Sequence, residues 1–169
     1  KTLTALWIKE RIKAKRSLVL VPSLSLLSQI LRDWTAGASD SFDPMCVCSD
    51  KSVASKDKVE DDWITNTSEI GAPVTSDSEE IKEFLKRDSS QVVFSTYQSS
   101  QLIAEAQRDL SVPEFDIAFA DEAHRCAGKV SDAFGCVLDD EKIRSNKRLF
   151  LTATPRVLSK NIKTRAKEY

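Results

Sequence analysis

The stretch that decides the fold is FDIAFADEAHR, residues 115–125. It begins with a short apolar run and then changes abruptly to the adjacent acids Asp121 and Glu122. Two neighbouring carboxylates at the end of a buried strand are unfavourable unless solvent, a partner or a cation compensates their charge. Ligands of open α/β sheets bind just beyond the carboxyl ends of the strands. The stretch therefore predicts a buried strand with an acidic site at its end.

On both sides of this stretch, strand patterns alternate with helix patterns, which predicts an α/β fold with a mainly parallel, doubly wound sheet. Ser23 and the pair Ser76-Asp77 are placed to begin helices. The polar, aperiodic residues 50–76 predict a surface insertion. The remaining apolar runs predict strands at residues 17–21, 45–49, 92–94 and 149–151, and helical spacing predicts helices at residues 2–14, 23–36, 76–85 and 102–110 and within 129–138.

The bulk composition is that of one globular domain. The chain has 169 residues, of which 41% are hydrophobic and 30% charged, and its net charge of −1 identifies no nucleic-acid partner. No apolar run approaches the roughly 18 residues of a membrane span, and a signal-peptide pattern is lacking, so we expect a cytoplasmic protein without a membrane partner. The cysteines lack the spacing of a zinc knuckle, and we expect reduced, mostly buried thiols at Cys46, Cys48, Cys126 and Cys136.

The acidic pair suits a particular chemistry. Carboxylate oxygens are hard ligands of the kind that Mg²⁺ prefers, and the ion is commonly completed by water and by substrate phosphates. One acid can hold the metal while its neighbour orients and deprotonates an attacking water. The alternative for Asp121-Glu122 taken alone is an ordinary acidic turn after a strand.

Several stretches together resemble the first RecA-like motor domain of superfamily 2 DEAD/DEAH-box helicases and translocases. FDIAFADEAHR resembles motif II in its DEAH form, and LFLTATPR (149–156) resembles motif III. LVLVPSLSLL (18–27) resembles motif Ia, and VFSTYQS (93–99) a later motif with a Thr-Tyr-Gln core. The motifs follow the family's order, and only the predicted insertion falls outside the resemblance. The chain would then be a partial first RecA-like ATP-binding domain over residues 1–169, a three-layer α/β/α P-loop NTPase fold.

The resemblance implies that ATP and Mg²⁺ are the cofactors. It gives Asp121 the role of Mg²⁺ ligand and Glu122 that of general base, and it makes His124 a link to motif III. In motif III, Thr152, Ala153 and Thr154 would transmit the state of the nucleotide. The alternatives are a structural histidine and hydroxyls that cap the end of a strand.

The first two residues resemble the end of a phosphate-binding loop, G-x-x-x-x-G-K-[ST]. The resemblance implies that Lys1 contacts an ATP phosphate and that Thr2 coordinates Mg²⁺. The alternative is a Lys-Thr pair without such a role. On the P-loop interpretation the chain lacks the first strand of the fold and most of the loop whose N–H groups cradle phosphates, so we expect it to bind ATP poorly and to be inactive alone.

The nucleic-acid contacts implied by the resemblance fall in two motifs. They are Pro22 and Ser23 in motif Ia, and Ser95, Thr96, Tyr97 and Gln98 in the Thr-Tyr-Gln motif. Hydroxyl and backbone N–H contacts of this kind hold the sugar-phosphate backbone without reading sequence. The alternative for each is a helix cap or a strand-end turn.

The combination of DEAHR with TATPR resembles the restriction-enzyme-like branch, which includes type I and type ISP restriction translocases and predicted helicases with helicase-associated domains. RNA-processing DEAH-box enzymes usually have Ser-Ala-Thr in motif III, so we expect double-stranded DNA rather than RNA as the partner. A second RecA-like domain of the same parent chain would supply an arginine finger. Three alternatives remain: a non-catalytic docking module derived from a motor domain, an RNA helicase, or a P-loop ATPase of another class.

Overall fold

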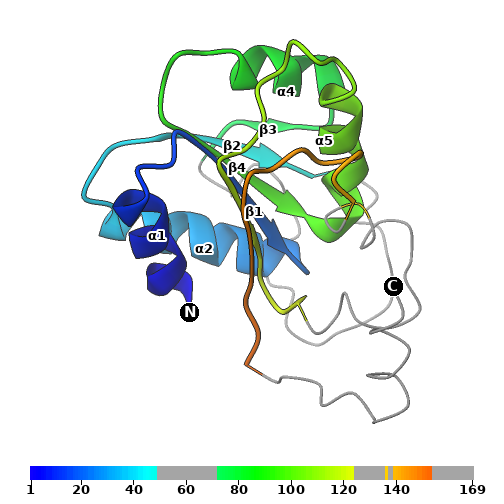
Figure 1. The fold of residues 1–169 in the computed structure, drawn as a ribbon. Helices are drawn as coiled ribbons and strands as arrows, with labels where there is room; N and C mark the ends of the chain where they lie inside the picture. The colour runs from blue at the N-terminus through cyan, green and yellow to red at the C-terminus, as the bar shows by residue number, and fades with distance from the viewer. Residues whose placement is uncertain (49–71, 124–135, 137–138, 154–169) are drawn as a thin grey trace, which may run out of the picture.

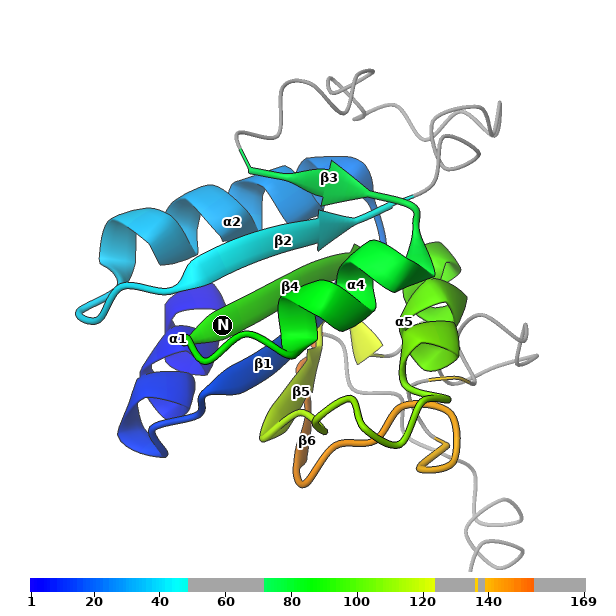
Figure 2. The same cartoon turned by 90° about the horizontal axis from the view of Figure 1, so that it is seen from above.

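A computed structural model of the chain describes residues 1–48, 72–123, 136 and 139–153. Six strands form one sheet in the order β3-β2-β4-β1-β5-β6, and all of its pairings are parallel. The strands are β1 (Arg16–Val21), β2 (Asp43–Val47), β3 (Val74–Thr75), β4 (Gln91–Thr96), β5 (Ile117–Ala120) and β6 (Arg148–Phe150). Figure 2 shows that strand direction turns progressively from β3 to β6, the twist expected of an open sheet.

Strand β1 lies in the middle of the sheet because both of its faces are apolar. It pairs with β4 on one side and with β5 on the other. Leu18 and Leu20 point into one core, whereas Val19 and Val21 point into the other. Side chains of successive strand residues point to opposite faces, so a continuous apolar run is what a strand covered on both sides requires.

Helices cover both faces of the sheet (Figure 1). On one face, α1 and α2 pack over Val19, Phe94 and Phe119. On the other face, α4 and α5 pack over Leu18, Leu20 and Val93. The helical elements are α1 (Thr2–Arg11), α2 (Leu24–Gly37), α4 (Ser78–Leu85), the 3₁₀ turn η2 (Tyr97–Ser99) and α5 (Ser100–Ala106). These three layers confirm the predicted α/β/α architecture with a parallel sheet.

Two helices begin at the residues that the sequence indicates. The Ser23 hydroxyl accepts a hydrogen bond from the Leu26 N–H at 3.4 Å, which caps α2. The Asp77 carboxylate accepts one from the Glu79 N–H at 2.9 Å, which caps α4. Such side chains satisfy N–H groups that have no partner inside the helix.

The structure also shifts some of the predicted boundaries. Strand β2 occupies residues 43–47 instead of 45–49, because its pairing with β4 begins with Asp43 opposite Gln91. Helix α5 ends at Ala106, short of the predicted residue 110. Strand β3 lies inside the range predicted as an insertion, most of which, like the helix predicted within 129–138, falls outside the described residues.

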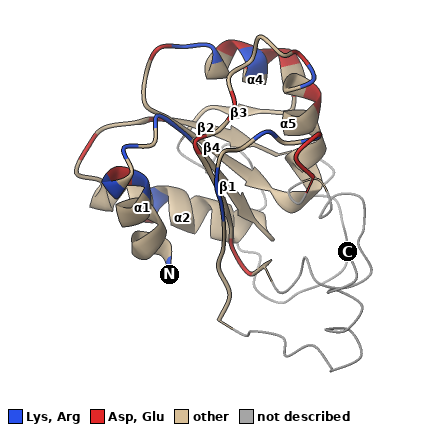
Figure 3. Cartoon of the chain, in the orientation of Figure 1, with Lys and Arg blue, Asp and Glu red and all other residues tan. Residues whose placement is uncertain are grey.

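Charged side chains gather on α4, at the end of α1 and in the connecting loops, and they are sparse along the strands (Figure 3). This distribution follows from the burial of both sheet faces. Within the described part of the chain, no helix is both long and apolar enough to cross a membrane.

Candidate functional site

The acidic turn after β5 is held by backbone hydrogen bonds to both neighbouring strands. The Asp121 N–H donates to the Leu20 carbonyl of β1 at 2.9 Å. The Ala123 N–H donates to the Leu151 carbonyl, just after β6, also at 2.9 Å. The stretches that resemble motifs Ia, II and III are therefore joined through their backbones at the carboxyl end of the sheet, the end at which ligands bind in such folds.

Lys1 reaches this acidic turn from the start of α1. Its ammonium group hydrogen-bonds to the Glu122 carboxylate and lies 3.6 Å from Asp121 Oδ1. The hydrogen bond from Lys1 to Glu122 raises the pKa of Lys1 above its usual value; burial opposes this shift, and the Asp121 charge reinforces it. Lys1 therefore stays positively charged at neutral pH. The structure thus brings together three residues to which the resemblance assigns phosphate, metal and water chemistry.

Glu122 adopts an uncommon backbone conformation, with a φ of 49°. This left-handed region places the Cβ of an L-residue too close to the backbone, so it is used chiefly by glycine. The Glu122 N–H donates to Asp121 Oδ1 at 2.9 Å, which helps to close the tight turn. Non-glycine residues with such strained dihedral angles concentrate at functional sites.

The other predicted residues of the ATP site are a metal ligand, Thr2, and the residues predicted to couple the site to motif III. Thr2 is half-buried, and its carbonyl accepts a hydrogen bond from Trp34 Nε1 at 3.1 Å. Thr152 is half-buried and Ala153 is exposed, both just after β6. His124 and Thr154 lie outside the described residues. The roles predicted for all five residues remain predictions.

The two segments predicted to contact nucleic acid also lie at the carboxyl ends of their strands. Pro22 is buried, and Ser23 is half-buried as the cap of α2. Ser95 and Thr96 are buried, and their hydroxyls bond within the same segment, to the Thr96 carbonyl and to Ser99 Oγ. Gln98 is exposed. In the second segment, Gln98 therefore has the side chain that is best placed to contact nucleic acid.

One contact of the site, made by Tyr97 of the Thr-Tyr-Gln motif, was not predicted from the sequence. Tyr97 is fully buried, and its hydroxyl donates to the Asp121 carbonyl at 2.7 Å. The Thr-Tyr-Gln motif is therefore bonded directly to the acidic turn. The position of Tyr97 in the Thr-Tyr-Gln motif indicated that this residue is functional. Its partner, the Asp121 carbonyl, could not be predicted, because the contact depends on the order of the strands in the sheet.

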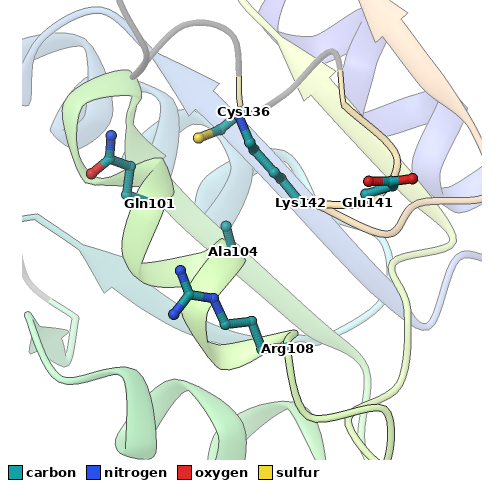
Figure 4. Close-up of a pocket in the computed structure, with 6 residues that line it drawn as sticks. All are labelled: Gln101, Ala104, Arg108, Cys136, Glu141 and Lys142. Carbon is teal, nitrogen blue, oxygen red and sulfur yellow. The ribbon is translucent and has the colours of Figure 1, made fainter.

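A separate hollow of about 340 Å³ lies between α5 and the segment before β6 (Figure 4). Among the residues that the structure describes, none of those predicted to form the site lines this hollow. It is bordered by Gln101, Ala104, Arg108, Cys136, Glu141 and Lys142.

The residues predicted to hold Mg²⁺ at the acidic turn offer carboxylate oxygens as ligands. The described residues contain no group of three or more His, Cys, Asp and Glu side chains that could hold an ion. However, Asp121 and Glu122 converge on one cation, the Lys1 ammonium. One or two carboxylates with water and phosphate oxygens are the usual protein contribution to a Mg²⁺ site, so this donor set fits the ion.

The model of the family described as "Type III restriction enzyme, res subunit" (ResIII) matches residues 1–157. The chain belongs to the ResIII family. A "probable helicase" of African swine fever virus, from a Kenyan pig isolate, is 33% identical to this ResIII chain over 159 residues, and the match covers 92% of this chain and 16% of the viral protein. The same protein of a Malawian tick isolate gives the same identity and coverage.

Two solved structures are similar to the ResIII chain. A nuclease-deletion mutant of the type ISP restriction-modification enzyme LlaGI, in complex with a DNA substrate mimic, is 34% identical with a TM-score of 0.72, and the match covers 93% of this chain and 13% of that one. The ATP-dependent type ISP enzyme LlaBIII, bound to DNA, is 34% identical with a TM-score of 0.73, over 92% of this chain and 11% of that one. The chain thus spans only a small part of the length of these relatives. It is a first RecA-like domain of the restriction-enzyme branch of superfamily 2, as predicted.

Proposed function

We propose that this chain is the ATP-binding part of a motor that hydrolyses ATP while acting on double-stranded DNA. One observation carries the proposal: Lys1, Asp121 and Glu122, which are far apart in the sequence, converge at the carboxyl end of a RecA-like sheet. Lys1 would supply a cation that binds phosphate, and the two acids would supply oxygens that bind metal and accept a proton. A module used only for docking would not need this combination.

Each residue of this group would have a separate task. The Glu122 carboxylate would accept a proton from the water whose oxygen attacks the terminal phosphorus of ATP, while the bond from that phosphorus to the bridging oxygen of ADP breaks. Asp121 and the Thr2 hydroxyl would hold Mg²⁺, which when bound neutralises phosphate charge. Lys1, charged at neutral pH, would exchange its acidic partners for phosphate oxygens.

DNA is the proposed nucleic acid because the two type ISP structures hold DNA or a mimic of a DNA substrate. In this chain, Gln98 and the Pro22-Ser23 turn follow neighbouring strands at the same end of the sheet as the acidic turn. Contacts there would grip the sugar-phosphate backbone. A second RecA-like domain of the parent protein would close the nucleotide site, and a cytoplasmic location would suit such a motor.

The test is ATP hydrolysis by the full-length protein with and without double-stranded DNA. We expect DNA to stimulate hydrolysis and Glu122→Gln to lower the stimulated rate by about 10²–10⁴-fold, since it removes the proposed base. ATP binding, measured with a fluorescent analogue, should persist in this variant. Glu114→Gln is the matched control, because Glu114 is exposed and precedes the same strand.

Other outcomes separate the rival functions. ATP binding without stimulation by any nucleic acid would contradict the motor and favour a docking module. Stimulation by RNA but not by DNA would favour an RNA helicase. A Glu122→Gln variant as active as the Glu114→Gln control would remove Glu122 from the mechanism.

A further inference from the structure

A tyrosine connects the ends of two strands that are not neighbours. Tyr97 follows β4, and the carbonyl that it contacts, that of Asp121, follows β5, with β1 between them in the sheet. The side chain is fully buried, and the distance from Oη to the carbonyl oxygen is 2.7 Å. A buried tyrosine hydroxyl normally finds a hydrogen-bond partner. Here that partner belongs to the acidic turn.

This carbonyl lies in the same planar peptide unit as the Glu122 nitrogen. Fixing the oxygen therefore fixes the plane from which Glu122 departs with its φ of 49°. The same peptide is also constrained on its nitrogen side, because the Glu122 N–H donates to Asp121 Oδ1. A left-handed residue persists only where its surroundings determine it strongly, and Tyr97 supplies one of these constraints.

The segment that carries Tyr97 also reaches the surface. The next residue, Gln98, is exposed and is predicted to contact nucleic acid. Two adjacent residues thus carry a side chain available to DNA and a hydroxyl bonded to the acidic turn. A shift of this segment on DNA binding would be transmitted through the Tyr97 hydroxyl to Glu122.

We propose that Tyr97 is a positioning residue for ATP hydrolysis, whose hydroxyl holds the Asp121–Glu122 peptide and connects it to the segment that DNA contacts. The inference rests on the proposed function. The competing explanation is that the ring only fills the core, where it packs in the same cluster as Leu20 and Ala120. Phenylalanine would fill that space equally well, so the two explanations differ in the hydroxyl alone.

The experiment compares Tyr97→Phe with wild type in the full-length protein at saturating DNA. Loss of one positioning hydrogen bond should lower kcat about tenfold. KM for ATP should change by less than about twofold, since Tyr97 is not proposed to contact the nucleotide. A 3-fluorotyrosine at position 97 keeps the ring and the hydroxyl and should retain kcat.

The matched control is Thr75→Val on β3, the edge strand on the far side of the sheet from β5 and the acidic turn. It also deletes a buried hydroxyl that makes one hydrogen bond to backbone, to the Asp77 N–H at 3.0 Å. Both variants should lower the melting temperature by similar amounts, but only Tyr97→Phe should lower kcat. An unchanged kcat in Tyr97→Phe, or an equal loss of kcat in Thr75→Val, would overturn the inference and leave the motor intact. Absence of DNA-stimulated hydrolysis in wild type would instead overturn the proposed function.

Discussion

At the scale of single residues, Lys9 shows what burial does to a charge. Lys9 on α1 is 3% exposed, and its ammonium lies 3.3 Å from Ser90 Oγ and 5.3 Å from the centre of the Phe42 ring. Burial lowers its pKa, and the acids Glu10 and Asp40 only partly oppose the shift. No carboxylate is paired with Lys9 among the salt bridges of the described residues. The charged form is therefore less favourable in the folded state than in the unfolded state.

We expect Lys9→Met to raise the free energy of unfolding by about 1 kcal/mol at pH 7. A folded-state pKa below the unfolded value penalises folding fully at pH values below both. This penalty disappears as pH rises through the folded-state pKa towards the ordinary lysine value. The advantage of methionine should therefore shrink between pH 7 and pH 10 in urea titrations. Lys147→Met, at an exposed lysine, is the control; a destabilised Lys9→Met protein would show that the contacts with Phe42 and Ser90 outweigh burial.

At the scale of elements, the end of α1 is a Schellman motif without glycine. The Ala14 N–H donates to the Lys9 carbonyl and the Lys13 N–H to the Glu10 carbonyl, both at 3.0 Å. Lys13 consequently has a φ of 54°, in the left-handed region. Glycine usually occupies this position because it lacks a Cβ.

Lys13→Gly should accordingly stabilise the protein by about 0.5–1 kcal/mol. The same change at Lys147, which is exposed and does not have a positive φ, should destabilise it, because glycine increases the entropy of the unfolded chain. Urea midpoints of the two variants measured side by side check the sign. If both variants lose stability, the left-handed conformation of Lys13 carries no strain.

Helices and strands could be predicted where the sequence has a clear pattern of apolar residues or a capping residue. β1, β4 and β5 are apolar on both faces, and the caps Ser23 and Asp77 mark their helices. β3 could not be predicted, since two residues in a polar region carry no period and pair only because β2 offers an edge. Just after the end of α5, the Gln107 side chain exchanges hydrogen bonds with the Arg144 backbone, and the Gln107 carbonyl accepts one from the Arg144 guanidinium. This contact joins distant segments, so no local pattern could predict it.

At the scale of the whole molecule, Trp34 joins the layers on one face of the sheet. Its ring meets Phe94 of β4 and Phe119 of β5 edge to face, with centroids 5.7 Å apart in both pairs. Its indole N–H bonds to the Thr2 carbonyl of α1. The residue is fully buried. Trp34 therefore connects two strands and a second helix to α2.

Trp34→Ala should lower the free energy of unfolding by about 3–5 kcal/mol, because it leaves a large cavity and removes the ring contacts with Phe42, Phe94 and Phe119. Trp7→Ala is the matched control, since Trp7 on α1 is 58% exposed and its loss should change stability by about 0.5 kcal/mol or less. Thermal unfolding followed by circular dichroism distinguishes the two. Equal losses in both variants would contradict a central role for Trp34.

The candidate site was predictable in its composition but not in its connections. Asp121 and Glu122 stand out because acids directly follow a buried strand. The resemblance assigned Lys1 and Glu122 to one ATP site, but their direct contact was not predicted, because no local spacing links residues 121 positions apart. The Tyr97 contact depends on β4 and β5 flanking the same strand, which is a property of the assembled sheet.

The placement of β1 has a consequence for how the molecule is made. β1 is synthesised before both of its partners, and β4 and β5 lie far along the chain from it. Parallel pairings of such high contact order form slowly and leave apolar strand edges exposed meanwhile. In the nascent chain, β1 therefore remains an exposed apolar segment without partner strands until residues 91–96 and 117–120 have been synthesised. The acidic turn follows β5 and bonds to the Leu20 carbonyl, so it would form late in folding. A chain that is interrupted before Asp121 should therefore aggregate and have no partial activity.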